Sequence, residues 1–200
     1  IGFELAAGQR LVDPDSASDI YLYMVDGGYN VLLTLSSDTP DVLLADGRRY
    51  TASNLEPVVG PLRSRDPATG ETTYLVAFVT DSAGTLSGSS DPAISDGSLD
   101  LAMVSVVLRP APAGSPYPTL ARREDLQIGH GDEGVTGALS FAGNGQSIAY
   151  VASDGAVLRT MPVGPIGATG PSEIRLTAMN GAIGGVSVSH DGNLVAFDST

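Results

Sequence analysis

The sequence predicts an all-β protein built from repeated antiparallel strand pairs. Glycine and proline account for 25 and 13 of the 200 residues, and only 16% of the residues are charged. Short apolar runs that end at turn residues recur along the chain, whereas no segment shows a convincing helical pattern. This combination is typical of a turn-rich β protein rather than of a helical one.

One turn motif recurs at nearly constant spacing. The segments LSFAGNGQSIAY (139–150) and VSVSHDGNLVAF (186–197) align without gaps and lie 47 residues apart. Weaker copies are DPAISDGSLDLAM (91–103) and PDVLLADGRRYTAS (40–53). Each Asp-Gly or Asn-Gly pair predicts a tight two-residue β-turn, because these residues tolerate positive φ angles. The turn glycines are Gly47, Gly97, Gly145 and Gly192, with spacings of 50, 48 and 47 residues.

Strand-like segments between these turns predict a second, looser hairpin in each period, at 18–35, 58–78 and 155–179. Four short strands in each period of about 48 residues are the sequence signature of a β-propeller blade. The sequence therefore predicts a single propeller region over residues 1–200, made of four-stranded antiparallel blades. Blades are expected at 40–79, 91–134 and 136–179, with partial blades at 1–35 and 184–200.

The segment 109–134 is the least regular part of the chain. It begins with a proline-rich stretch, which predicts an edge strand or an extended loop, because proline is excluded from central strands. Within it, TLARREDLQ (119–127) has enough helix propensity for one helical turn, with no further pattern to support it.

The repeated turns resemble the WD40-like repeats of TolB-type β-propellers. The matching pieces are SHDGNLVAF and AGNGQSIAY, with SDPAISDG and LLADGRRYTAS as more distant relatives. The opening IGFELAAGQRLVDPDSASDIYLYMVDGG is similar to a form common among large bacterial surface propellers. The resemblance spans the whole chain, strongest over 136–200 and weakest over 105–135. It implies a propeller fold and an extracytoplasmic location, in the periplasm, at the cell surface or secreted.

The number of repeats bounds the assembly. The chain holds about four blade lengths with overhanging ends. The chain opens inside the second strand of one blade and ends just after the second strand of another, and in a closed four-bladed ring these two strands would compete for one place. We therefore expect a segment of a propeller of roughly six to eight blades, or a propeller completed by further residues or another chain.

The net charge of the chain and the short length of its apolar runs argue against several classes of partner. The net charge is −13, lysine is absent, and the ten arginines occur singly or in short pairs. Such a chain is a poor match for a nucleic-acid backbone or an anionic membrane, and its arginine pairs are expected to form local salt bridges. The longest apolar run, residues 101–108, is far shorter than the ~20 residues of a membrane helix. Cysteine is absent, which excludes disulfides and thiolate chemistry.

The two histidines offer little catalytic chemistry. His130 lies in GHGDEG beside Asp132 and Glu133, which could ligate a metal, although adjacent side chains in a glycine-rich loop rarely converge on one ion. His190 lies in a predicted turn, where a solvated side chain is expected. No serine can be paired with either histidine from sequence, and the GxSxG motif is absent.

A calcium site is the sharpest metal hypothesis. The loop DPDSASD places Asp13, Asp15 and Asp19 close together, and calcium prefers several hard oxygen ligands from one loop. A second set, Asp91, Asp96 and Asp100, is less persuasive because Asp96 belongs to a predicted turn. The alternative is that these residues only form loops by bonding to their own backbone.

Two functional classes follow from the sequence. The first is a non-catalytic propeller scaffold that binds a protein or a glycan through loops on one face. The second is the propeller portion of an enzyme, either the gating domain of a serine peptidase or a lyase or hydrolase with its site in the central channel. The regular repeats and the lack of a recognisable catalytic set favour the first class.

Overall fold

The computed structural model is all-β wherever it describes the chain. Its described residues contain strands and turns but no helix, and thus no helix that could cross a membrane. All strand pairs are antiparallel. The described residues are 4–5, 9–10, 20–24, 29–32, 42–43, 49–50, 54–80, 99–114, 118–127, 134–154, 157–161, 172–176 and 182–199.

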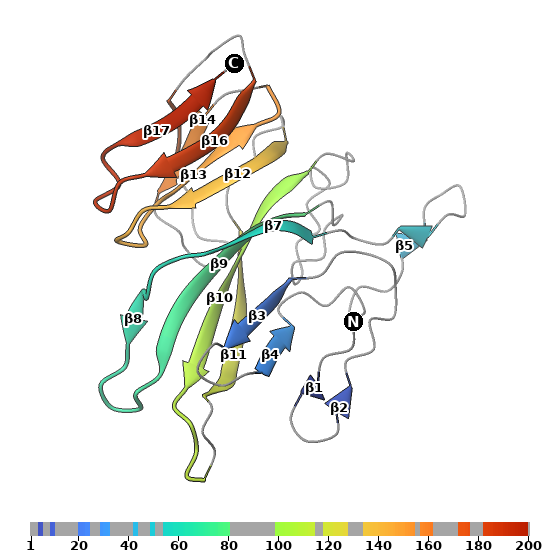
Figure 1. Ribbon diagram of the computed structural model, residues 1–200, viewed down its shortest axis with the longest axis vertical. Helices are drawn as coiled ribbons and strands as arrows, with labels where there is room; N and C mark the ends of the chain where they lie inside the picture. The colour runs from blue at the N-terminus through green and yellow to red at the C-terminus, as the bar shows by residue number, and fades with distance from the viewer. Residues whose placement is uncertain are drawn as a thin grey trace.

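The largest sheet has five strands. Strand β9 (Thr72–Thr80) pairs with β10 (Asp100–Arg109) on one edge, and β10 pairs in turn with β11 (Thr119–Gln127) (Figure 1). The other edge of β9 carries β7 (Asn54–Val59) and then β8 (Ser64–Arg65). β7 and β8 thus pair with successive parts of the same edge of β9.

Strands β9 and β10 are buried on both faces. Leu75, Ala77 and Val79 belong to one apolar cluster, whereas Val76 and Phe78 belong to another on the opposite side. A strand covered on both faces has no need of polar residues at alternate positions. This explains why the longest apolar run of the sequence is a strand in the middle of this sheet.

The second sheet is a four-stranded meander. Its strands follow chain order: β12 (Val135–Phe141), β13 (Ile148–Ala152), β14 (Val157–Met161) and β15 (Ser172–Arg175). A third unit, β16 (Ile183–Val188) with β17 (Val195–Ser199), is a two-stranded hairpin.

Three shorter strand pairs precede the large sheet. They are β1 (Glu4–Leu5) with β2 (Gln9–Arg10), β3 (Tyr21–Met24) with β4 (Tyr29–Leu32), and β5 (Val42–Leu43) with β6 (Arg49–Tyr50). Ile20, which directly precedes β3, is buried in the apolar cluster on the second face of the large sheet.

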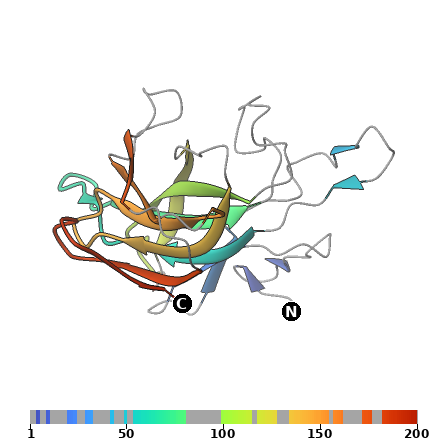
Figure 2. The same cartoon turned by 90° about the horizontal axis from the view of Figure 1, so that it is seen from above.

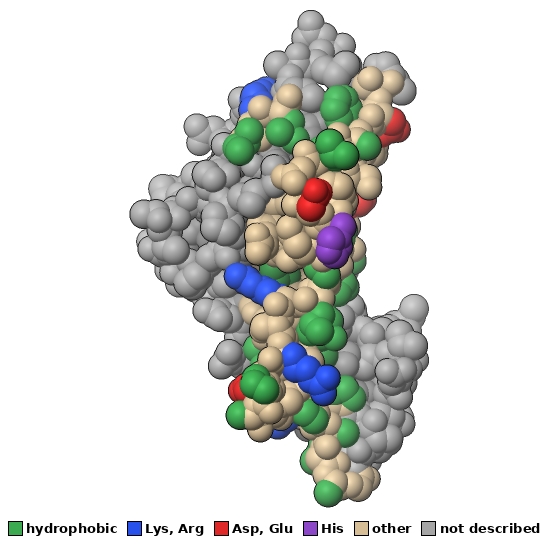
Figure 3. Space-filling view, turned by 90° about the vertical axis from the view of Figure 1, so that its left-hand side faces the viewer, with side chains coloured by type: hydrophobic (Ala, Val, Ile, Leu, Met, Phe, Trp, Pro, Cys, Tyr) green, Lys and Arg blue, Asp and Glu red, His purple; other side chains and the backbone are tan. Residues whose placement is uncertain are grey.

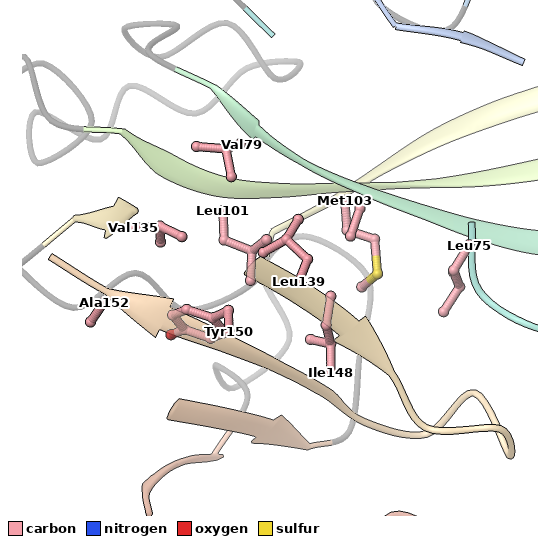
Figure 4. Packing of buried hydrophobic residues seen from close by; sticks show 10 residues of the cluster. Leu75, Val79, Leu101, Met103, Val135, Leu139, Ile148, Tyr150 and Ala152 are labelled. Carbon is pink, nitrogen blue, oxygen red and sulfur yellow. The ribbon is translucent and has the colours of Figure 1, made fainter. Parts of the chain in front are cut away.

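The core lies between the two large sheets. Side chains from β9 and β10 meet side chains from β12 and β13 in one continuous apolar layer (Figure 4). Tyr150 and Met103 are fully buried there. The labelled members of this layer are Leu75, Val79, Leu101, Met103, Val135, Leu139, Ile148, Tyr150 and Ala152.

The first strand of each unit lies next to the first strand of the following unit. β12 lies against β7 on one side and against β16 on the other, so the three units succeed one another in space as they do in sequence (Figure 2). Within the described residues the sheets do not close into a ring.

Most predicted hairpins are present, but the predicted limits of the repeat differ from the observed sheets. The expected strand pairs at 18–35, 40–53, 58–78, 139–150, 155–179 and 186–197 all contain antiparallel pairs. However, β9 and β10 share one sheet although they were assigned to the blades at 40–79 and 91–134. Residues 91–98 lie outside the described residues, so the hairpin around Gly97 is not seen.

Two local predictions need correction. The single helical turn considered for 119–127 is wrong, because these residues form the edge strand β11, as the edge-strand alternative for 109–134 requires. The two-residue turn type is also wrong at Gly145 and Gly192: these glycines have φ of 68° and 74°, but their Asn and Asp neighbours do not have positive φ. The acid and amide bind the turn backbone through their side chains instead.

Candidate functional site

All but one of the predicted metal ligands lie outside the described residues; the exception is Asp100, the first residue of β10. The ligands outside include Asp13, Asp15 and Asp19 and equally His130 of the GHGDEG loop. The calcium site therefore stays a prediction. His190 is described, exposed and located in the turn between β16 and β17, as expected.

The described surface has one place where repeated turns come together. The turns 142–147 and 189–194 have the same backbone bonds: Ala142 N–H donates to Ser147 O at 2.9 Å, and Ser189 N–H donates to Leu194 O at 2.9 Å. The segment 60–63 joins them, because Gly145 approaches Pro61 so closely that a Cβ would lie 3.3 Å from its Cγ. We call these three segments, 60–63, 142–147 and 189–194, the stacked turns.

Asn144 links one turn to the next. Its backbone N–H donates to His190 O at 2.8 Å, and its side-chain Nδ2 donates to Asp191 O at 3.1 Å. Its Oδ1 accepts from Gln146 N–H within its own turn at 3.0 Å. Asn144 and Asp191 occupy the same position of the repeat, 47 residues apart. The gapless alignment of the two motifs contained this pairing, but a sequence repeat alone does not show that equivalent residues touch.

Close packing between Gly143 and His190 completes this link. A Cβ at Gly143 would overlap the His190 ring and would lie 3.0 Å from His190 Cα. Glycine is therefore required at 143 for the two turns to approach each other. His190 thus has a packing role in addition to being exposed.

We expect Asn144→Ala to lower the free energy of unfolding by about 1–2 kcal/mol, because it removes two hydrogen bonds of a partly solvated turn. Hydrogen exchange should become faster in both turns. Asn193→Ala is the matched control, since its side chain bonds only to Asp191 in its own turn, at 2.9 Å. Faster exchange in 142–147 with the control variant would contradict the assignment of Asn144 as the link.

Asp191 organises the second turn. Its Oδ1 accepts from Ser189 Oγ at 2.6 Å and from Asn193 N–H at 3.1 Å. The Ser189 hydroxyl first, and then the Asn193 donors, lower the pKa of the Asp191 carboxyl from 3.8 to about 2. These bonds favour the ionised form, and they explain why Asp serves here without positive φ.

This pKa shift predicts a loss of stability in acid. The lowered pKa means that the contribution of Asp191 is complete above 3.8 and is lost as the pH falls toward about 2. An NMR titration of the Asp191 side-chain carbonyl carbon should give a midpoint near 2. Ser189→Ala, which removes the first donor, should move that midpoint upward, and a wild-type midpoint at the ordinary value of 3.8 would contradict the bonding.

A second polar region lies at the β-bulges of β7, β12 and β16, the first strands of the three units. The register shifts in β7, β12 and β16, and two non-glycine residues, Glu56 and Ala138, have φ of 54° and 52°. Glu56 lies against Gly137, where a Cβ would lie 3.5 Å from its Cδ. The carboxylate of Asp198, in β17, lies closer still to Gly184 of β16, where a Cβ would lie 3.0 Å from its Oδ2. Bulges of this kind re-aim side chains and leave backbone groups unpaired.

The chemistry of these regions is that of a mixed polar surface. Among the described residues no group of three or more His, Asp and Glu side chains is placed to hold a metal ion. Ser189 bonds to Asp191 directly, without His190 between them, so this Ser-His-Asp sequence does not have the geometry of a catalytic triad. Figure 3 shows the side of the molecule on which apolar, cationic and acidic side chains and a histidine alternate along the described band.

The described residues define an all-β protein whose antiparallel sheets pack face to face. The chain matches no family model, no curated protein and no solved structure. The resemblance to TolB-type propellers therefore stays a prediction.

Proposed function

We propose that the chain is a segment of a β-propeller that serves as an extracytoplasmic, non-catalytic scaffold for binding a protein or a glycan. The interpretation as a propeller is supported by the order of the three units, which is the same in space as along the chain. Three antiparallel units succeed one another, and β7, β12 and β16, the first strand of each, lie side by side. In a propeller the first strands of successive blades line the central axis in this way.

The stacked turns are the observation that carries the binding role. They hold two equivalent exposed turns in a fixed relative position through Asn144. Gln146, His190 and Leu194 project from this row as exposed side chains of different chemistry. A surface that is ordered before binding loses little conformational entropy when a ligand binds. The proposed ligand is therefore recognised across adjacent turns rather than in a deep pocket.

Screening the full chain against a glycan microarray and a panel of secreted proteins tests this function. We expect a ligand whose binding is weakened at least about tenfold by Gln146→Glu combined with Leu194→Ser, with the melting temperature unchanged. Arg65→Ala is the matched control, since this exposed residue lies on β8, outside the stacked turns. Ligand binding that ignores the turn variant, or turnover of the bound glycan or peptide, would contradict the proposal.

A further inference from the structure

Asn144 is followed by Gly145, and this dipeptide is open to a spontaneous chemical reaction. Asparagine is among the chemically labile residues of proteins. The backbone nitrogen of the next residue attacks the side-chain Cγ, and glycine hinders this attack least because it has no side chain. The N–Cγ bond forms, the Cγ–Nδ2 bond breaks, and ammonia leaves with the proton of the attacking N–H. Water then breaks the new N–Cγ bond, which leaves aspartate, or the original peptide C–N bond, which leaves isoaspartate.

In the folded chain the groups that must react are held in hydrogen bonds. The attacking group, Gly145 N–H, donates to Ala142 O at 2.9 Å. On the Asn144 side chain, Oδ1 accepts from Gln146 N–H at 3.0 Å, and Nδ2, the leaving group, donates to Asp191 O at 3.1 Å. The reaction therefore requires that the turn opens first, and its rate follows the population of the open state.

The product, aspartate, is the residue that the next turn already carries at this position. Asp191 Oδ1 accepts from Asn193 N–H at 3.1 Å, which is the bond that Asn144 Oδ1 makes within its own turn. Gly192 N–H closes the second turn on Ser189 O at 3.0 Å, as the glycine of the first turn does. Aspartate at this position can thus hold its own turn.

We propose that Asn144 is a deamidation site, and that its conversion to aspartate disconnects the turn 142–147 from the turn 189–194 while each turn keeps its own fold. A carboxylate has no N–H, so the bond from Nδ2 to Asp191 O is lost and two acceptors face each other. Isoaspartate, which also carries a carboxylate, loses the same bond. The hydrogen bond between the turns thus delays the reaction and is destroyed by it.

Incubation of the full chain at mildly alkaline pH, with and without urea, tests the reaction. Tandem mass spectrometry locates the modified residues, and we expect deamidation of Asn144 to be at least about tenfold faster in urea. Asn180, in the other Asn-Gly pair of the sequence, gives the reference rate for the denatured chain. Asn193, which precedes the bulkier Leu194, is the negative control. Equal rates with and without urea, or an unmodified Asn144 in urea, would overturn the proposal.

Gly143→Ala separates the contact between the turns from overall stability. Its Cβ would overlap the His190 ring, so we expect the native chain to deamidate about fivefold faster or more. Gly184→Ala is the matched control, because its Cβ would crowd Asp198 Oδ2 at 3.0 Å, away from the turns, and the rate should stay within about twofold. In urea both variants should react like the wild type. Equal acceleration of the two native variants would show that the contact does not protect Asn144.

Asn144→Asp supplies the product directly, so its outcome does not depend on the reaction. Hydrogen exchange should become faster at residue 144, whose N–H donates to His190 O, whereas Gln146 N–H should stay protected by the new carboxylate. Asn144→Ala should lose protection at both positions. Wild-type exchange at residue 144 of the aspartate variant, or exchange at Gln146 as fast as in the alanine variant, would contradict the proposal. None of these measurements needs a ligand, so their outcome is independent of the binding role proposed above.

Discussion

Replacing Phe78 by alanine is expected to lower the free energy of unfolding by about 3–5 kcal/mol. Phe78 is 0% exposed and lies in the apolar cluster on the second face of the large sheet, together with Ile20. Removing its ring leaves a cavity between a rigid β9 and its neighbours. Chemical denaturation followed by circular dichroism measures the change.

The chain contains its own control for this substitution. The tetrapeptide LVAF occurs at 75–78 and again at 194–197, so Phe197→Ala makes the same change in the same local sequence. Phe197 is 36% exposed, and we expect a loss of about 1 kcal/mol or less. Similar losses for Phe78→Ala and Phe197→Ala would show that the large sheet is not covered on its second face as described.

Adding one methyl group at Gly143 is expected to separate the stacked turns. The Cβ of Gly143→Ala would overlap the His190 ring and crowd its backbone, so the link through Asn144 would have to lengthen. We expect a loss of about 1–3 kcal/mol, as for other overpacked sites. Thermal unfolding gives the magnitude, and hydrogen exchange in 142–147 and 189–194 gives the location.

A second substitution distinguishes this clash from a general effect of the glycine. His190→Ala alone should be nearly neutral, within about 0.5 kcal/mol, because the side chain is exposed. Combined with Gly143→Ala it should restore part of the lost stability, since the ring that blocks the new methyl group is gone. Strictly additive losses in the double variant would contradict the contact.

The strands and the turn glycines could be predicted from the sequence because the signals are local. Alternating apolar residues around Gly145 and Gly192 specify a hairpin whatever surrounds it. The same local rule led to the wrong turn type, because it treats Asp as a residue of positive φ. In the structure Asp191 instead accepts hydrogen bonds from Ser189 and Asn193.

The extent of the large sheet could not be predicted from turn spacing. The Gly97 motif assigned β10 to the blade at 91–134, as the second strand of its first hairpin, but β10 is held in the sheet by a long register with β9. The sequence contains a better signal for the limits of the sheets, in a short strand motif that recurs along the chain. LVAF at 75–78 and SIAY at 147–150 are second strands of successive units, which shows that β9 corresponds to β13. LVAF at 75–78 lies farther from SIAY in the sequence than SIAY lies from the LVAF at 194–197, because β10 and β11 lie between the first two motifs.

The contacts of the candidate site depend on three-dimensional packing. The repeat aligns Asn144 with Asp191, but only the stacking of the two turns brings the Asn144 amide to the Asp191 carbonyl. The calcium hypothesis at Asp13, Asp15 and Asp19 rests on the sequence alone.

The hydrogen bonds of Asn144 run from the first turn, 142–147, to the second turn, 189–194, and the equivalent residue of the second turn cannot repeat them. An amide both accepts and donates, so Asn144 can order its own turn through Oδ1 and reach forward through Nδ2. A carboxylate has no N–H, and both oxygens of Asp191 already accept hydrogen bonds inside the turn. The Asn144 side chain connects the turn 142–147 to the turn 189–194. The equivalent side chain, that of Asp191, cannot donate a hydrogen bond to a further turn in the same way. A molecule that adjoins the second turn at this position receives no hydrogen bond from the Asp191 side chain.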